Sequence, residues 1–204
     1  LGSILSIILY IYYICIYLYV FISPMELELF NRFMYGTCEV NPDPLLPAGL
    51  PQLYGQVLFR QFYPSGAVQV IVNLRGLPTN DKQERAIHIH QYGDLSEGFV
   101  TAGPHYNPLG VDHPSHPGDL GNFFPSNGTV RRRLNVQAAT LFGGPSILGR
   151  AVVIHEKEDD LGLGSDEESK RSGNAGRRIA GCVIGISSET LWNKTMNREK
   201  NAKR

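Results

Sequence analysis

The sequence has no surplus of either charge and almost no helical periodicity. Its 19 basic residues balance its 19 acidic residues, so no overall field points to nucleic acid or a membrane surface as the partner. No long amphipathic helix appears before the last residues, which excludes an all-helical fold. The chain contains no internal repeat. We therefore expect one domain of ordinary size whose function comes from a local site.

Cysteine is also scarce, with three residues in the whole chain. Cys15 lies in an apolar N-terminal segment, so Cys38 and Cys182 are the only pair left in the rest of the chain. An even pair suits an oxidising compartment. Two sequons, at Asn127 and Asn193, would permit N-glycosylation in a secreted protein.

The first 24 residues carry no charge and are apolar almost throughout. They are long enough for a membrane span of about 20 residues, but they lack the positive start of a secretory signal and overrun its usual apolar length. Three interpretations stay open: a signal anchor in the membrane, an atypical or incomplete signal peptide, or translated non-coding sequence ahead of a true start at Met25. We leave residues 1–24 out of the fold prediction and expect an N-terminal extension over 25–52, the main domain over 53–188 and a basic tail over 189–204.

From Tyr54 onward, short apolar runs alternate with polar residues at a period of two. This period is typical of β-strands, and Gly, Pro and Asn separate the runs as in turns. In the run AVQVIVNLRG, for example, Val68, Val70, Val72 and Leu74 share one face. Similar runs predict strands over 56–62, 86–91, 129–136, 149–156 and 179–187, and therefore an all-β domain.

Two connections between these strands, 92–123 and 157–177, are unusually long, which is typical of functional loops. The first follows a run that contains HIH, in which His88 and His90 point to the same face of a strand. This arrangement predicts a two-armed metal clamp. His155, in a distant strand, is placed to close the clamp.

The loop over 92–123 supplies the remaining candidate ligands, which are His105, His113, His116 and Asp119. Imidazole suits zinc and copper, and one carboxylate among histidines suits a closed four-ligand zinc site. A single histidine is most often a surface residue or a packed core residue. Here all six histidines fall where they would serve a binuclear centre, so we predict two metal ions.

At these positions the sequence resembles the copper/zinc superoxide dismutases. The segments HIHQYGD, AGPHYNP, HPGDLGN, GRAVVIHEKEDDLG and GNAGRRIAGCVIGI occur in the family's order and approximate spacing. The resemblance covers roughly residues 38–192 and is greatest to the extracellular subgroup. It implies a flattened, eight-stranded Greek-key barrel, an immunoglobulin-like sandwich, with long metal-binding and electrostatic loops. It also implies conversion of superoxide to dioxygen and hydrogen peroxide by alternate reduction and oxidation of a copper ion.

The resemblance assigns the ligands residue by residue. The copper ligands are His88, His90, His105 and His155. The zinc ligands are His105, His113, His116 and Asp119. His105 would therefore bridge both ions, which requires the loss of both ring protons.

Other roles follow from the same resemblance. Asp159 matches the carboxylate that joins copper and zinc ligands by hydrogen bonds. Arg178 matches the arginine that docks the superoxide anion, and His105 would donate a proton to the second substrate. Ser172 matches a hydroxyl position that narrows the channel, where the family usually has Thr. The charged segment 165–171 would guide the anion, although an ordinary solvated charge run explains it equally well.

Two positions depart from the family's pattern. Most members tie the loop after HIH to the barrel by a disulfide, and the two matching positions here hold Phe99 and Gly181. The chain thus lacks a crosslink that typically contributes about 2–4 kcal/mol. We expect Phe99 to pack into the room left by Gly181. Cys38 and Cys182 match cysteines of the extracellular subgroup, which implies a disulfide between them.

The resemblance also implies partners and a location. Extracellular members end in a dense basic cluster that binds heparan sulfate, but here the basic residues Lys194, Arg198, Lys200, Lys203 and Arg204 are diluted. The tail would therefore bind weakly and in a salt-sensitive way, or would end in solvent. A homo-oligomer and secretion are expected, while an anchored chain or a cytoplasmic product starting at Met25 stays open.

One rival function stays open as well. A non-catalytic relative, which binds metal or matrix without turnover, would be consistent with the loss of the family disulfide. The presence of all matched ligands, of Asp159 and of Arg178 argues for the enzyme.

Overall fold

The computed structural model describes residue 10 and residues 33–201. Apart from residue 10, the apolar segment 1–24 lies outside the described residues, as do Met25 and the last two basic residues, Lys203 and Arg204. Among the described residues, no helix is long and apolar enough to span a bilayer.

Strands dominate residues 33–201, as the period-two pattern predicts. The strands are β1 (Phe33–Pro42), β2 (Tyr54–Phe62), β3 (Val68–Arg75), β4 (Arg85–His90), β5 (Ser96–Phe99), β6 (Asp119–Phe123), β7 (Thr129–Val136), β8 (Ala151–His155), β9 (Arg178–Val183) and β10 (Gly185–Ile186). The helices are η1 (Val100–Ala102), α3 (Glu167–Ser172) and α4 (Glu189–Asn201).

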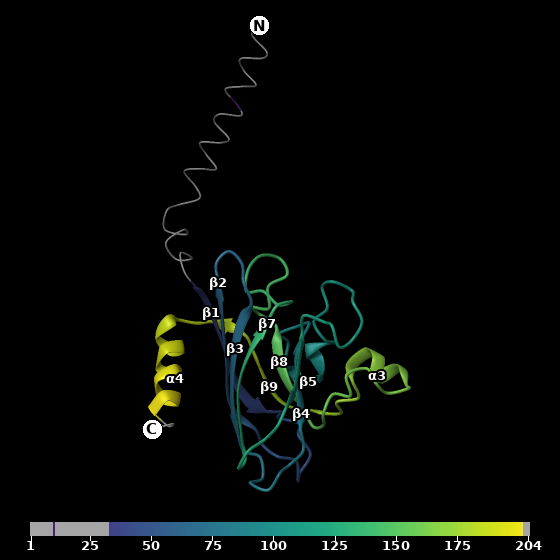
Figure 1. The fold of residues 1–204 in the computed structure, drawn as a ribbon. Coiled ribbons are helices and arrows are strands. Elements are labelled where there is room, and N and C mark those ends of the chain that lie inside the picture. Colours follow the sequence, from purple (N-terminus) through teal and green to yellow (C-terminus); the bar gives the residue numbers. More distant parts are fainter. Residues whose placement is uncertain (1–9, 11–32, 202–204) are drawn as a thin grey trace. The chain divides into compact units, whose positions relative to one another are not determined.

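Within the described chain, eight strands follow one another in the order β6-β4-β8-β9-β1-β2-β3-β7. The sheet is curled (Figure 1), and its two end strands, β6 and β7, are in contact. β7 pairs with β3 although three strands separate them in the sequence, as expected for a Greek key. The prediction of a flattened, eight-stranded Greek-key barrel is confirmed.

β1 lies between β9 and β2 in the sheet, although it falls in the segment expected as an N-terminal extension. Its sequence, FMYGTCEVNP, shows little apolar alternation, so the pattern did not predict it. Only its inner face is strongly apolar, where Cys38 and Val40 are each 1% exposed. The short strands β5 and β6 were also missed, because four or five residues show no clear period.

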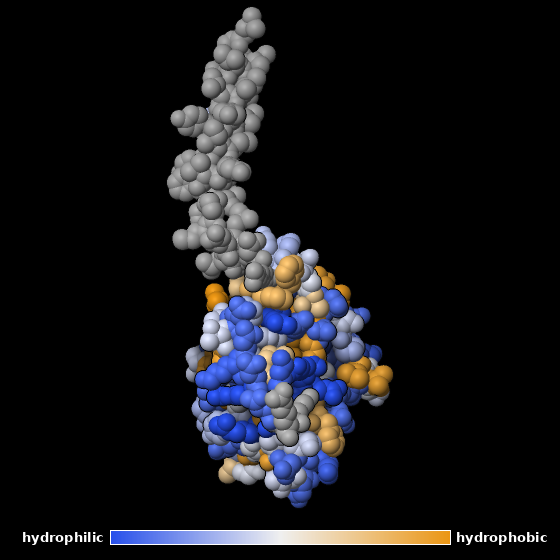
Figure 2. All heavy atoms as spheres, turned by 60° about the vertical axis from the view of Figure 1, so that its left-hand side comes forward, coloured by the Kyte–Doolittle hydropathy of each residue, from blue (hydrophilic) through white to orange (hydrophobic). Residues whose placement is uncertain are grey.

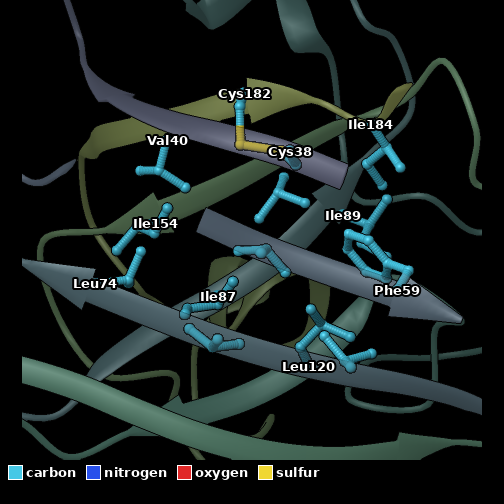
Figure 3. Packing of buried hydrophobic residues seen from close by; sticks show 14 of the residues in the cluster. Cys38, Val40, Phe59, Leu74, Ile87, Ile89, Leu120, Ile154, Cys182 and Ile184 are labelled. Carbon is cyan, nitrogen blue, oxygen red and sulfur yellow. A yellow bond between two sulfur atoms is a disulfide. The ribbon is translucent and has the colours of Figure 1, made fainter. Parts of the chain in front are cut away.

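The barrel interior is filled by apolar side chains from both halves of the sheet (Figure 3). Val70 and Val72 of β3 face Ile87 and Ile89 of β4 in this core, and all four are at most 1% exposed. Full burial of each such side chain stabilises the fold by about 1.5–3 kcal/mol.

A Cys38–Cys182 disulfide joins β1 to β9 at one end of the core, with a Cα–Cα distance of 5.4 Å (Figure 3). The bridge implied by the family resemblance is therefore present in the structure. It lies next to the register pairs Asn41↔Gly181 and Pro42↔Ala180. A crosslink of this kind typically contributes about 2–4 kcal/mol by restricting the unfolded chain.

α4 packs against the outer face of the barrel, on the opposite side from α3 (Figure 1). Trp192 is 4% exposed and lies on Leu58 and Ile71. The guanidinium carbon of Arg60 lies 4.6 Å from the Trp192 ring centroid, a cation–π contact. The described part of the tail, residues 189–201, is thus helical, as the sequence indicates, but its first turn is docked and not free in solvent.

Candidate metal centre

The pairing of β4 with β8 begins the site. His88 lies opposite Val153, and His90 lies opposite Ala151. Because neighbouring side chains on a strand point to opposite faces, Ile89 enters the core while both histidines point outward under the loops. An isolated bridge between His90 and His105 brings the loop after η1 to the same place.

Four imidazoles meet here, and we call them the four-histidine group: His88, His90, His105 and His155. One possible ligand atom from each lies within 4.8 Å of the others, and all four residues are buried. The Nε2 atoms of His90 and His155 are 3.3 Å apart. The structure thus brings together the four residues that the resemblance assigns to copper.

The outer nitrogens of three of these rings have protein partners. His88 Nε2 lies 2.9 Å from an Asp159 carboxylate oxygen, and His90 Nδ1 lies 2.8 Å from the Gly103 carbonyl oxygen. His155 Nδ1 lies 3.2 Å from the Gly176 carbonyl oxygen. These contacts leave His88 Nδ1, His90 Nε2 and His155 Nε2 to face the common centre.

Two atoms at this centre, His88 Nδ1 and His105 Nε2, are buried without a hydrogen-bond partner in the described chain. A buried polar atom without a partner costs about 1–3 kcal/mol, so such atoms need another explanation. A metal ion that accepts their lone pairs supplies one. Imidazole nitrogens arranged in this way suit copper or zinc.

A second set surrounds one carboxylate, and we call it the Asp119 group: His105, His113, His116 and Asp119. The Nδ1 atoms of His105, His113 and His116 lie 2.9, 3.0 and 3.1 Å from Asp119 oxygens. Of these nitrogens, those of His113 and His116 are buried without a satisfactory hydrogen bond in the described chain. Three imidazoles and a carboxylate form a closed four-ligand set of the kind that suits zinc.

His105 belongs to both sets. Its Nε2 faces the four-histidine group and its Nδ1 faces Asp119. The ring centroids of His88 and His105 are 3.9 Å apart. One imidazole thus has a nitrogen available to each of two adjacent metal positions.

Asp159 connects the two groups from behind. Its two carboxylate oxygens lie 2.9 Å from His88 Nε2 and 2.8 Å from His113 Nε2, and the residue is 2% exposed. This geometry fixes the rotation of one ring in each group, which supports the connecting role predicted for it.

Burial controls the protonation of three of these histidines, His88, His90 and His155. Desolvation lowers the pKa of His88 to about 4, against the smaller opposing effect of the Asp159 hydrogen bond. Burial, together with the nearby positive charge of Arg178, also lowers the pKa values of His90 and His155 well below their usual range. These rings are therefore neutral near pH 7, which is the form that binds metal.

The Asp119 group behaves differently because it contains negative charge. Burial by itself raises the pKa of Asp119, but hydrogen bonds from His105 and His113 outweigh it and hold that pKa well below its usual range. Burial alone would lower the pKa of His113, but the nearby carboxylates of Asp119 and Asp159 favour its protonated form and raise that pKa to about 9. The group thus holds an ionised carboxylate among imidazoles, a charge balance that favours a cation.

Arg178 lies beside the four-histidine group because it pairs with His155 across β8 and β9. Its half-buried guanidinium donates to the carbonyl oxygens of Phe99 at 2.6 Å and Gly103 at 2.7 Å. The Gly103 oxygen is also the partner of His90 Nδ1. One carbonyl thus links the arginine to a candidate copper ligand.

The predicted guiding segment 165–171 forms most of α3, a short helix capped by the Asp166 carboxylate, which accepts the Ser169 N–H at 2.9 Å. A hollow of about 1100 Å³ opens between this helix and the metal-binding loop, and Lys170 and Arg171 line it together with three of the histidines. Ser172 donates its hydroxyl to the Glu168 carboxylate. Its role in a channel stays a prediction.

Two supporting residues were missed by sequence reasoning. Asn122 binds the backbone of Asp159 twice, by a 2.7 Å bond from the Asp159 N–H and a 2.8 Å bond to its carbonyl. Gly173, at φ +71°, ends α3 directly over Asp159, where an added Cβ would come within 1.8 Å of Oδ1. Glycine after a helix is a usual C-cap signal, so Gly173 was open to prediction.

Phe99 is 3% exposed, and its ring lies against Gly181. A Cβ added to Gly181 would come within 2.8 Å of the Phe99 ring. The expected compensation for the missing family disulfide is therefore present.

Both sequon asparagines, Asn127 and Asn193, are exposed, so glycosylation at either site stays a prediction that the geometry permits.

Comparison with known proteins gives a consistent result. The family model described as copper/zinc superoxide dismutase (SODC) matches residues 53–184. The extracellular superoxide dismutase [Cu-Zn] of Rattus norvegicus is 47% identical over 174 residues, which span 85% of this chain and 71% of the relative. The protein of the same name from Homo sapiens is 46% identical over 172 residues, 84% of this chain and 72% of the relative. The superoxide dismutase [Cu-Zn] of Schizosaccharomyces pombe is 44% identical over 146 residues, 68% of this chain and 94% of the relative.

Proposed function

The chain belongs to the copper/zinc superoxide dismutase family; it is an oxidoreductase that acts on superoxide, and we propose which of its residues perform the reaction. His88, His90, His105 and His155 hold copper. His105, His113, His116 and Asp119 hold zinc. The observation that carries this assignment is His105, whose two ring nitrogens face the two groups.

Bound copper supplies the chemistry, a one-electron exchange with superoxide in each half of the cycle, and bound zinc supplies a fixed positive charge. The protein does the rest. His105 Nε2 would hold one proton and deliver it to the second superoxide as that is reduced to hydroperoxide, and solvent would supply the second proton of hydrogen peroxide. Asp159 keeps the His88 and His113 rings in place during the cycle, so little reorganisation is needed.

Arg178 docks the substrate in this proposal. Its guanidinium is held by two loop carbonyls and lies beside the four-histidine group, where burial holds the pKa of His90 well below its usual range. Superoxide is a small anion, and its encounter rate rises where positive potential is focused at a site. Lys170 and Arg171 of α3 extend that potential over the neighbouring hollow.

The domain assignment is part of the same proposal. Residues 53–188 form the catalytic domain, residues 25–52 contribute β1 to it, and residues 189–204 form a basic tail.

We also propose that the protein is secreted. The rat and human relatives are both named extracellular, and the Cys38–Cys182 disulfide suits an oxidising compartment.

Heparan sulfate binding, expected of the tail, has a wider basis in the structure. Arg131, Arg132 and Arg133 are exposed on β7, and a hollow of about 710 Å³ beside α4 is lined by Arg75, Arg131 and Arg198. The face that carries α4 is largely hydrophilic (Figure 2). Sulfate groups suit bidentate arginine contacts. The test compares the wild-type chain with a Lys200→Gln/Arg198→Gln variant on a heparin column. Elution of the wild-type chain at higher salt than the variant would support this proposal. Elution of both proteins at the same salt concentration would oppose it.

We further propose a homo-oligomer formed through residues near β5 and β10. Val183 and Ile186 are large apolar side chains that are 39% and 74% exposed, and Gly93 lies against Val183. We propose that these side chains belong to one apolar interface patch. Light scattering on the purified chain tests this: a mass of one chain would exclude the oligomer.

The enzymatic proposal is tested by superoxide removal on metal-loaded protein, comparing Arg178→Gln with Arg177→Gln. Arg177 is the matched control, because its exposed side chain makes only a 3.9 Å contact with Glu156. We expect the Arg178 variant to lose on the order of tenfold or more in rate through lost anion attraction, and the Arg177 variant to lose little. Both metals bound without turnover in the native chain would favour the non-catalytic relative.

A further inference from the structure

Asp43 lies one residue after β1, where that strand leaves the barrel beside β9. Its backbone N–H donates to the Ile179 carbonyl at 3.0 Å, and Ile179 is the neighbour of Arg178 in β9. Its carboxylate accepts the Phe99 N–H at 3.3 Å. Asp43 therefore joins the end of β1 to two segments, the strand that carries Arg178 and the loop that Arg178 contacts.

The contact at Phe99 leads directly to the arginine. The Phe99 carbonyl accepts one guanidinium N–H of Arg178 at 2.6 Å. The same loop ends at Gly103, whose carbonyl accepts a second N–H at 2.7 Å. The backbone of Phe99 thus accepts a hydrogen bond from Arg178 and donates one to Asp43, so a shift of the Phe99 backbone changes the orientation of the guanidinium.

The loop is shaped around this carboxylate. Gly98 has φ +69°, and a Cβ at that position would come within 2.7 Å of Asp43 Oδ1. Glycine therefore satisfies two requirements here, a backbone conformation that side chains disfavour and the close approach of a charged oxygen. A chance surface contact would not require this residue.

Neighbouring structure holds the end of β1, next to Asp43, in a fixed position. The Cys38–Cys182 disulfide and the pair Pro42↔Ala180 hold the end of β1 against β9. Phe99 is anchored on its other side, because its ring packs on Gly181. The carboxylate is thus presented from a fixed strand to a loop that lacks its usual covalent tether.

We propose that Asp43 is a positioning residue for Arg178: through the backbone of Phe99 it holds the loop carbonyls that orient the guanidinium towards the four-histidine group. The proposal rests on the role given above to Arg178 as the anion-docking residue. Asp43 and Phe99 together hold this loop against the barrel, which is the role of the loop-to-barrel disulfide that this chain lacks.

A simpler role for Asp43 makes a different prediction. Its Oδ1 also accepts the Leu45 N–H at 2.8 Å, and its carbonyl accepts the Leu46 N–H at 3.0 Å. A residue that only caps this turn would affect stability but not the binding of an anion at the copper centre. The affinity of a small anion therefore separates the two roles.

The test uses the full chain loaded with copper and zinc, as wild type, Asp43→Ala and Asp94→Ala. Asp94 is the matched control, because its exposed carboxylate accepts the Ser96 N–H at 2.9 Å in the same loop without contacting Phe99. Azide is titrated and followed by copper absorption. Metal content, superoxide turnover and amide hydrogen exchange over 96–103 are measured on the same samples.

We expect Asp43→Ala to bind azide about 3- to 10-fold more weakly, the equilibrium factor of one lost hydrogen bond. Its turnover should fall by a similar factor, its exchange over 96–103 should quicken, and its metal content and copper spectrum should not change. Asp94→Ala should match wild type. Asp43→Asn, which keeps one acceptor oxygen, should lie between them and serves if the alanine variant does not fold.

Unchanged azide affinity in Asp43→Ala would overturn the proposal. It would show that Asp43 only caps the turn that follows β1. Equal weakening in Asp94→Ala would also overturn it, since general loosening of the loop would then be the cause. If Asp43→Ala alone weakens azide binding but no protein turns over superoxide, the positioning role stands and the proposed function fails.

Discussion

Phe99 lies with its ring over Gly181, so close that a side chain on the glycine would collide with it. A Cβ at Gly181 would come within 2.8 Å of the ring and within 2.4 Å of the Val152 carbonyl oxygen. The ring therefore occupies space that only glycine leaves open. Through this buried contact, Phe99 holds its loop against the barrel. Most members of the family hold the same loop by a disulfide.

We predict that Gly181→Ala destabilises the protein by about 1–3 kcal/mol, the usual cost of overpacking. Phe99→Ala should cost more, about 3–5 kcal/mol, because it leaves a cavity. Urea unfolding measures both. The double variant Phe99→Ala/Gly181→Ala should cost less than the sum of these two single variants, because the two residues are in contact. Additive losses would contradict this account.

Asp159 should control the retention of both metals, because it contacts one histidine of each group. We expect Asp159→Ala to weaken copper and zinc binding by about 10- to 100-fold each, measured by competition with a chelator of known affinity. Asp160→Ala is the control. It loses bonds to Ser169 and Asn174 but touches neither group, so metal affinity should be unchanged. Loss of one metal alone in Asp159→Ala would count against the connecting role.

The stability of the metal-free protein should fall on the acid side of neutrality. Burial lowers the pKa of His88 to about 4 and lowers those of His90 and His155 as well. In the unfolded chain these groups take up protons near pH 6.5, while the folded protein excludes them. Stability is therefore lost as the pH falls from about 6.5 towards 4.

The protonation of His113 changes the pH dependence of stability in the opposite direction. Its pKa is raised to about 9 because the effect of the Asp119 and Asp159 carboxylates outweighs its burial. Its contribution is complete below pH 6.5 and is lost as the pH rises through about 9. Urea unfolding with a chelator present should therefore show a maximum near pH 6.5. Zinc should remove the alkaline loss, since His113 then gives its nitrogen to the metal, and a profile unchanged by zinc would argue against His113 as a ligand.

Trp192 offers a direct probe of α4, because it is the only tryptophan in the chain. Trp192→Ala should uncover Leu58 and Ile71 and cost about 3 kcal/mol, near the low end for a buried aromatic. In the native protein, iodide should quench its fluorescence poorly. Strong quenching at low urea would show that α4 is not docked in solution.

Much of the site could be predicted from the sequence, because the strand period places His88, Ile89 and His90 without reference to the rest of the fold. The strand over 129–136 was predicted with the bounds that it has in the structure. The loop histidines at 105, 113 and 116 carried no period, and only their joint number and the family resemblance pointed to the metals.

Other features depend on long-range packing and were not open to sequence reasoning. β1 has weak alternation, and only its position between β9 and β2 reveals it as a barrel strand. The docking of Trp192 depends on two outward-facing residues of β2 and β3, which the pattern treats as solvent positions. Asp43 contacts a loop 56 residues away, and nothing local marks it.

The most direct test of the central claim measures metal content and superoxide turnover on one purified sample, for the native chain and for His105→Ala. The account predicts about one copper and one zinc per native chain, with turnover that depends on both metals. His105→Ala should lose turnover and bind both metals less tightly, because His105 faces both groups. Zinc without copper, both metals without turnover, or a fully active His105→Ala variant would contradict it.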